Sequence, residues 1–174
     1  MVRPLTLVDL TVVAGEVLAD LETRLGQTGG HVELGALPTI DADPVQMHQL
    51  LQNLIGNALK FHRPEEKPLV QIEARMVTRP EEGIYKDLEV DPWCEITVAD
   101  NGIGFDEKHV DLIFRPFQRL HGRQAYEGSG IGLAICRKIV QRHGGCLTAR
   151  SRPGHGSTFI VALPVHQTVG ETGQ

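Results

Sequence analysis

Apolar side chains recur every three or four positions in three segments of the chain, which is the spacing of helices that bury one face. Each segment has helix start and stop signals at its ends. Aspartate can cap the first two, and in the second proline suits the first helical position and Gln46 can complete a capping box. Glycines follow the first and third segments. The predicted helices cover Asp9–Leu25, Asp43–Phe61 and Ile131–His143.

Alternation of apolar and polar residues predicts strands elsewhere. One strand covers Val70 to Met76, and another, with Ile96 and Val98, ends at Asp100. His31–Ile40 is typical of a short hairpin that turns near Gly35. The remaining segments are a closing hairpin of Cys146–Ser151 and Ser157–Pro164, a polar loop at Thr78–Pro92, and an irregular stretch at Gly104–Gly130 with a short helix at Lys108–Ile113.

The order of these elements predicts an α/β fold. Strands and helices interleave, but hairpins join several strands, which favours a mixed sheet covered by helices on one face over a doubly wound parallel sheet. A chain of 174 residues is long enough for one compact domain with its own core. We therefore expect a single domain over residues 1–174, with its core at about 8–165 and a frayed tail at 166–174.

Composition argues against several functions. The formal net charge is −5, so the chain has no general attraction for nucleic acid or an anionic membrane. No apolar run approaches membrane-spanning length and no signal-peptide pattern begins at Met1, which predicts a cytosolic protein without direct membrane insertion. The three cysteines are scattered, which argues against disulfides or structural zinc. Cys136 and Cys146 lie in apolar surroundings and are expected to be buried.

The second predicted helix carries a polar stripe. Asn53, Asn57 and Lys60 share one helical face, beside a core-facing side of leucines and alanine. An amide oxygen can complete the octahedral shell of Mg²⁺, and an amine one turn on can neutralise a phosphate oxygen, so the stripe suits a metal–triphosphate. Taken alone, it is better explained as a solvated polar face. Two asparagines in a helix interior are mildly unfavourable, however, and this favours a functional reason.

The strand through Val98 ends in the turn Asp100-Asn101-Gly102-Ile103-Gly104. An ionised aspartate only accepts hydrogen bonds, so Asp100 can select a donor such as the exocyclic amine of adenine and reject guanine, which offers an acceptor there. Gly102 and Gly104 allow a sharp turn and leave room for a flat base. A plain Asp-Asn-Gly turn is the alternative interpretation.

A glycine-rich run, Gly128–Gly132, leads directly into the third predicted helix. Free amides at a helix start bind phosphate, and glycine lets the ligand approach. A Rossmann site does not fit because a long polar loop precedes the glycines, and a Walker loop does not fit because no Lys-Ser or Lys-Thr follows them. That loop carries Arg115, Arg119 and Arg123 with three aromatic residues, and is typical of a lid over a ligand.

In combination, these motifs resemble the ATPase and kinase superfamily of DNA gyrase, a heat-shock chaperone, mismatch-repair MutL and sensor histidine kinases (the GHKL or HATPase_c superfamily). The resemblance extends from about Val8 to Val165, with five boxes in the family's order. The runs Phe117–His121 and Tyr126–Gly128 also look like those of phytochrome-type kinases. The boxes are an N-box at Gln49–Phe61, a first glycine box at Asp100–Gly104, an F-box at Ile113–Phe117, a second glycine box at Gly128–Ile135 and a last box at Gly154–Phe159.

The resemblance implies a two-layer α/β sandwich, in which a mixed, largely antiparallel sheet is covered on one face by three helices, and a site for ATP and Mg²⁺. By position, Asn57 is the implied magnesium ligand, Asp100 the adenine reader, and Thr158 its support through a water. Asn53, Lys60 and Arg119 are implied in phosphate binding and catalysis. The implied nucleotide-binding set is Asn53, Asn57, Lys60, Phe61, Asp100, Gly102, Gly104, Phe117, Arg119, Gly128, Gly130, Gly132, Leu133 and Thr158.

One position distinguishes phosphoryl transfer from hydrolysis. In hydrolases that resemble gyrase or MutL, the position four residues before the magnesium asparagine is a glutamate that activates water. This chain has Asn53 there, and an amide cannot act as a general base at neutral pH. The resemblance therefore implies a histidine kinase catalytic domain, whose partners are a histidine-containing dimerisation domain and, indirectly, a response regulator. None of the eight histidines lies in the family's phosphoacceptor pattern, so we expect no self-phosphorylation. An anti-sigma-factor type of serine kinase and a non-catalytic ATP-binding regulatory module remain alternatives.

Overall fold

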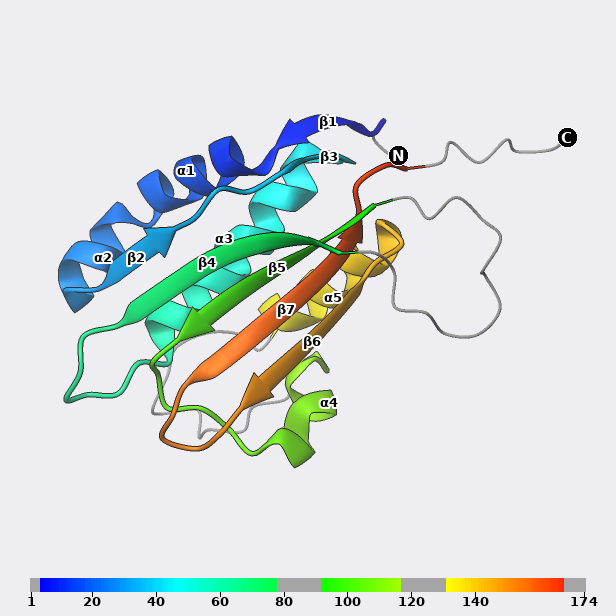
Figure 1. Cartoon of the computed structure of the whole chain (residues 1–174). Coiled ribbons are helices and arrows are strands. Elements are labelled where there is room, and N and C mark those ends of the chain that lie inside the picture. The colour runs from blue at the N-terminus through cyan, green and yellow to red at the C-terminus, as the bar shows by residue number, and fades with distance from the viewer. Residues whose placement is uncertain (1–3, 78–91, 117–130, 168–174) are drawn as a thin grey trace, which may run out of the picture.

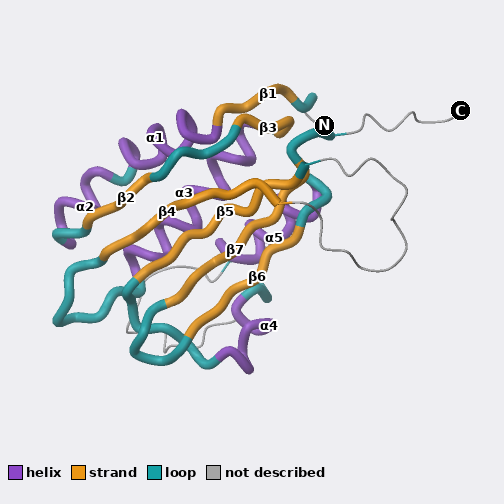
Figure 2. Tube along the Cα trace, in the orientation of Figure 1, coloured by secondary structure: helices purple, strands orange, loops and turns teal. Residues whose placement is uncertain are grey.

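The computed structural model describes residues 4–77, 92–116 and 131–167. Its centre is a five-stranded sheet, with the long helices packed side by side on one face of it (Figures 1 and 2). In chain order the elements are β1 (Thr6–Asp9), α1 (Leu10–Asp20), α2 (Glu22–Thr28), β2 (His31–Leu34), β3 (Thr39–Ala42), α3 (Pro44–Lys60), β4 (Leu69–Val77), β5 (Trp93–Asp100), a 3₁₀ turn (Glu107–His109), α4 (Val110–Ile113), α5 (Gly132–Arg142), β6 (Cys146–Ser151) and β7 (Ser157–Pro164).

The sheet has the order β2-β4-β5-β7-β6 and is largely antiparallel. Only its β2–β4 pair is parallel; β4–β5, β5–β7 and β6–β7 are antiparallel. A second, two-stranded sheet joins β1 to β3. α3 lies between α1 and α5 behind the sheet (Figure 1). The predicted architecture, a mixed sheet with three main helices on one face, is therefore confirmed.

The core fills the space between this sheet and the helices. Along β5 and β7 alternate side chains are buried, and along α3 the apolar positions recur at helical spacing, so both periods point to one interior. The opposite face of the sheet carries polar residues such as the paired Arg75 and Glu95. The core includes Leu50, Leu51, Leu54, Ile55, Leu59, Ile72, Ile96, Val98, Val161 and Leu163.

The first predicted helix is two helices. Asp9 is the N-cap of α1, as expected, because its carboxylate accepts hydrogen bonds from the amides of Thr11 and Val12. At Leu21 the backbone leaves helical geometry (φ −95°, ψ 5°) and the side chain is buried. α2 then continues to Thr28 and ends at Gly29, which adopts the left-handed conformation typical of a helix terminus.

The predicted hairpin at His31–Ile40 is wrong. β2 pairs in parallel with β4, whereas β3 pairs with β1 in the other sheet. Gly35 donates its amide to the Ile72 carbonyl, and the Pro38 carbonyl accepts from the amide of Leu10, so the chain passes from one sheet to the other. Turn residues between two short apolar runs did not distinguish a hairpin from such a crossing, because the partner strands are distant in sequence.

The expected capping box of α3 is half correct. Asp43 is the N-cap and accepts from the amides of Val45 and Gln46, but its own N–H donates to Nε2 of His143 (3.1 Å). The other ring nitrogen of His143 contacts the Ile139 carbonyl (2.8 Å). A buried histidine at the end of α5 thus completes the cap that Gln46 was expected to complete.

Gln167, near the start of the predicted tail at 166–174, is bonded to the rest of the domain. Gln167 donates its side-chain amide to the His143 carbonyl (2.6 Å) and its backbone amide to the carboxylate of Asp41 (3.1 Å). Val165 is buried and pairs with Asp41 and Pro92 through its backbone. These bonds anchor the chain through residue 167, and residues 168–174 lie outside the described part.

Two of the three cysteines are buried. Burial raises the pKa of the Cys94 thiol to about 11 and that of Cys136 to about 12, so both stay neutral. Cys146, which was expected to be buried, is exposed. It lies in the outward phase of β6, whereas Ala149 and Ser151 occupy the inward phase. Within the described ranges, no helix combines the length and apolar character needed to cross a membrane.

Replacing His143 with phenylalanine should lower the free energy of unfolding by about 2–4 kcal/mol, because the amide of Asp43 and the carbonyl of Ile139 lose a buried partner. Urea denaturation measures this change. The control is His31→Phe on the surface of β2, which should alter stability by less than about 0.5 kcal/mol. Equal effects of the two substitutions would contradict the proposed helix link.

Candidate functional site

The site is centred on Asp100, a half-buried carboxylate at the end of β5. Its Oδ1 accepts hydrogen bonds from the amides of Gly102 (2.9 Å) and Ser157 (3.2 Å). Oδ2 receives none from the described residues, so one acceptor oxygen stays available. Burial raises the pKa of this carboxyl from its ordinary 3.8 to about 6, and outweighs the two amides, which lower the pKa.

Three glycines allow the backbone around Asp100 to pack closely. A Cβ at Gly102 would lie 2.3 Å from the Phe61 carbonyl oxygen. At Gly104, which has φ +66°, the Cβ would lie 2.1 Å from the backbone carbonyl oxygen of Arg152. At Gly156, which has φ +80°, it would lie 1.9 Å from the backbone carbonyl oxygen of Asp100. The predicted glycines of the turn are thus required by contact with neighbouring backbone, in addition to any room they leave for a ligand.

Hydrogen bonds fasten the same turn to the end of α3. Ile103 donates its amide to the Phe61 carbonyl (2.9 Å). The Asn101 side chain accepts from the Leu69 amide (2.8 Å) and donates to the Lys67 carbonyl (3.1 Å). Nε of Arg63 donates to the Asn101 carbonyl (3.1 Å). The carboxylate of Asp100 is therefore held at a fixed position relative to the helix that carries the polar stripe.

The polar stripe of α3 contacts the start of α5. Asn53, Asn57 and Lys60 are all half-buried, while the opposite side of the helix is in the core. Nδ2 of Asn53 donates to the Gly132 carbonyl (3.4 Å). The Asn57 amide has no hydrogen-bond partner in the described part of the chain. Nζ of Lys60 lies 4.9 Å from the ring centroid of Phe61.

The structure therefore brings together most of the expected site. The site lies where the C-terminal ends of α3 and β5 meet the N-terminal end of α5. These ends carry the stripe and Phe61, the Asp100 turn, and Gly132, respectively. A Cβ at Gly132 would make an ordinary contact of 3.7 Å with Asn53, so packing in the described part does not require this glycine. Leu133 is partly buried against the core. The predicted residues Phe117, Arg119, Gly128 and Gly130 lie outside the described residues.

Ser157 donates its backbone amide directly to the Asp100 carboxylate, and the support expected from Thr158 through a water stays a prediction. Along β7 the buried residues are Phe159, Val161 and Leu163, so Ser157 shares the inward phase and Thr158 lies in the outward phase. The register opposes Thr158 to Ala99 of β5, and no bond joins it to the carboxylate. The donor is the backbone amide of Ser157, so the side-chain pattern of the strand in the sequence did not identify this contact.

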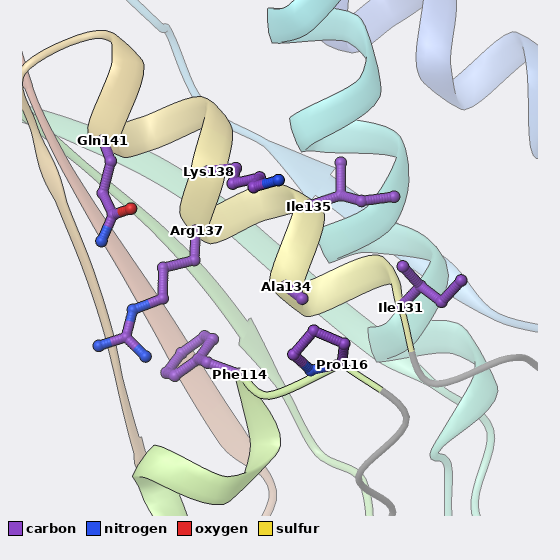
Figure 3. A pocket seen from close by; sticks show the side chains of 8 residues that line it. All are labelled: Phe114, Pro116, Ile131, Ala134, Ile135, Arg137, Lys138 and Gln141. Carbon is purple, nitrogen blue, oxygen red and sulfur yellow. The ribbon is translucent and has the colours of Figure 1, made fainter.

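A separate groove lies between α5 and the end of α4. It has a volume of about 260 Å³ and a mainly apolar floor with Arg137, Lys138 and Gln141 at its edge (Figure 3). The guanidinium of Arg137 stands 5.6 Å from the ring centroid of Phe114. None of the groove residues belongs to the stripe or the Asp100 turn. The groove residues are Phe114, Pro116, Ile131, Ala134, Ile135, Arg137, Lys138 and Gln141.

Comparison with known proteins identifies the family of the chain. Residues 42–167 match the family model described as histidine kinase-, DNA gyrase B-, and HSP90-like ATPase. The chain is 39% identical over 161 residues to the phytochrome-like protein Cph1 of Synechocystis, which covers 92% of this chain and 20% of that protein. The chain thus spans about a fifth of the length of this curated relative.

Solved structures show the same fold. The catalytic domain of the histidine kinase ThkA superposes with a TM-score of 0.71 at 24% identity, covering 95% of this chain and 100% of that chain. Full-length ShkA, solved in complex with AMPPNP, gives a TM-score of 0.73 at 26% identity over 97% of this chain and 32% of that chain. The latter structure contains a nucleotide analogue, in a chain of which about a third corresponds to this fold.

Asp100→Asn should stabilise the protein at neutral pH. The folded-state pKa of about 6 exceeds the ordinary 3.8, so the unfolded state loses its proton first and stability falls as the pH rises from about 4 to about 6. An amide oxygen can accept the same two N–H bonds without charge. The variant should gain about 1–3 kcal/mol over the wild type at pH 7.5. Urea denaturation at pH 7.5 and 3.5 tests this, and a gain that persists at pH 3.5 would contradict the buried charge as its cause.

Gly156→Ala should destabilise the protein more than Gly154→Ala. Both glycines have left-handed φ (+80° and +78°), so alanine strains each backbone by about 1–2 kcal/mol. A Cβ at position 156 would clash with the backbone carbonyl oxygen of Asp100, whereas a Cβ at position 154 would point into open space. This clash should lower the free energy of unfolding of Gly156→Ala by at least about 2 kcal/mol more than that of Gly154→Ala, as measured by urea denaturation. Equal losses would show that close packing behind Asp100 is unimportant.

Proposed function

The chain belongs to the family of histidine kinase-, DNA gyrase B- and HSP90-like ATPases, and we propose that it binds Mg-ATP and donates the γ-phosphoryl group to a histidine on a separate domain, in two-component signal transduction. The observation that carries the proposal is the Asp100 carboxylate, half-buried, fixed through Oδ1 and open at Oδ2, beside a helix that carries two asparagines and a lysine. The relative CikA of Synechococcus elongatus, a circadian input-output histidine kinase 32% identical over 94% of this chain, supports this type of activity, and the AMPPNP complex of ShkA supports nucleotide binding.

The open oxygen of Asp100 fits the adenine amine. An ionised carboxylate accepts hydrogen bonds, adenine donates from its exocyclic amine, and guanine has an acceptor at the same ring position. The Gly102 and Ser157 amides occupy Oδ1 from the protein side, which directs Oδ2 toward a ligand. The half-buried setting strengthens such a bond because less water competes for it. Base selection by Asp100 therefore follows from its environment.

The stripe of α3 and the start of α5 suit the triphosphate. The Asn57 oxygen would hold Mg²⁺, which supplies positive charge for the phosphates. Lys60, at the end of the same helix, and Arg119 provide further positive charge for phosphate oxygens. Gly132 begins α5, whose N-cap Ile131 makes no side-chain capping bond, so the first amides of this helix can donate to an anion.

Asn53 favours transfer over hydrolysis. Its amide donates to the Gly132 carbonyl and cannot accept a proton from water at neutral pH. In phosphoryl transfer, positioning and charge neutralisation provide most of the rate acceleration, so a separate imidazole can serve as the nucleophile. A histidine-containing dimerisation domain is the proposed acceptor and a response regulator the indirect partner. The cytosolic location expected from the sequence remains a prediction.

Calorimetric titration with ATP and Mg²⁺ tests the binding assignments. Asp100→Asn should weaken ATP binding about 10- to 100-fold, since the amine loses a charged acceptor. Asn53→Ala should leave most of the affinity, because the base contact and the Asn57 ligand remain. The matched control is Asp106→Asn, a nearby exposed carboxylate that should have no effect. Unchanged binding in Asp100→Asn would refute the adenine assignment.

Transfer is measured separately with radiolabelled ATP. The chain alone should incorporate no phosphate, and addition of a matching histidine-containing domain should give an acid-labile phosphate on that domain. Stable label on a serine of a protein substrate would support the serine-kinase alternative. ATP binding with no transfer to any candidate acceptor would support the non-catalytic regulatory module.

A further inference from the structure

Ser151 is a buried polar residue outside the site derived above. It is the last residue of β6, with a relative exposure of 8%. Its hydroxyl contacts the Phe105 amide (2.8 Å), the Gly156 carbonyl (2.8 Å) and the Ser157 hydroxyl (2.9 Å). Its backbone amide donates to Oε1 of Glu107 (3.1 Å). The side chain therefore joins β6 to the loop after Asp100 and to the start of β7.

The directions of these bonds follow from the number of protons. The Phe105 amide can only donate and the Gly156 carbonyl can only accept, so the single proton of Ser151 goes to Gly156. The Ser157 hydroxyl must then be the donor to the Ser151 oxygen. The donor and both lone pairs of Ser151 are thus used, and the orientation of the Ser157 hydroxyl is fixed.

Two of its hydrogen-bond partners, Gly156 just before β7 and Ser157 at its first position, contact Asp100. The Ser157 amide donates to Oδ1 of Asp100 (3.2 Å). The α-carbon of Gly156 packs so closely on the Asp100 carbonyl that a Cβ there would lie 1.9 Å from its oxygen. Ser151 is therefore one residue removed from Asp100 along two adjacent paths, one to its carboxylate through the Ser157 amide and one to its backbone carbonyl through the packing of Gly156.

We propose that Ser151 is a positioning residue that fixes the Asp100 carboxylate for recognition of the adenine amine. The inference rests on the proposed role of Asp100 as the adenine reader. Without the Ser151 hydroxyl, the Phe105 amide and the Gly156 carbonyl lose a buried partner and the Ser157 hydroxyl can rotate. The β6–β7 turn then shifts relative to Asp100, and selection of the base suffers more than binding of the triphosphate.

The other side of the Asp100 turn does not offer an equivalent residue. The Asn101 side chain bonds to the backbone of Lys67 and Leu69 in exposed surroundings, and neither of these partners contacts the Asp100 carboxylate. Ser151 is in contrast largely screened from water, where each hydrogen bond restricts its partners more strongly. Control of the carboxylate geometry is therefore assigned to the β6 side.

The test compares ATP with purine riboside triphosphate, which lacks the 6-amino group, by calorimetric titration with Mg²⁺. The wild type should prefer ATP by about 10- to 100-fold. Ser151→Ala should reduce this preference to about threefold or less. Ile40→Val removes one buried methylene from β3, in the other sheet, at a comparable stability cost and should keep the full preference. Thr148→Val removes an outward hydroxyl from the same strand and should also keep it.

Each outcome decides one question. If Ser151→Ala weakens both nucleotides by the same factor and keeps the preference for ATP, the residue is merely structural and the inference is overturned. A wild type without preference would instead overturn the adenine assignment of Asp100 itself. Should Ser151→Ala fail to fold, Ser151→Cys retains the volume with a weaker hydrogen bond and should show a partial loss of preference, whereas a full preference would overturn the proposal.

Discussion

Close contact between three backbone segments around one turn is the constraint on which the site depends. The Asp100–Gly104 turn packs against the Phe61 carbonyl on one side and against Arg152 and Gly156 on the other, at distances that leave no space for a side chain. Hydrogen bonds from Ile103 to Phe61 and from Gly154 to Ile103 close the same assembly. A helix end, a strand end and a hairpin turn are thereby held as one unit, and any ligand group that meets this unit encounters a fixed carboxylate.

The same constraint explains why a carboxylate is kept where an amide would fit. Burial raises the pKa of Asp100 more than its two backbone donors lower it, so ionisation at neutral pH costs stability. That cost is understandable if the second oxygen serves as an acceptor for a ligand, since active sites are where such destabilising groups are retained. The energetics of the residue therefore agree with the adenine assignment, which rests on geometry.

α3 connects this unit to the rest of the molecule. Its apolar side fills the middle of the core between α1 and α5, which fixes the rotation of the helix about its axis. Because side chains at i, i+4 and i+7 share one face, fixing the apolar side also fixes the direction of Asn53, Asn57 and Lys60. His143 and Asp43 lock the other end of the helix, far from the stripe. Packing of the apolar side and of the first turn of α3 thus fixes the positions of the polar side chains near its last turns.

Local sequence patterns determined the helical segments, apart from the break at Leu21, together with most strands and the stripe, because these depend on periodicity and capping between near neighbours in the chain. The Asp100 turn and its glycines could be identified for the same reason. Tertiary structure alone decided that β2 joins β4 while β3 joins β1, that His143 completes the cap of α3, and that Ser157 and Ser151 stand behind Asp100. Each of these depends on contacts between residues far apart in sequence, as in the bond between Asp43 and His143. Such contacts leave no periodic signal, and only the packing of the whole chain selects them from the many pairs that the sequence permits.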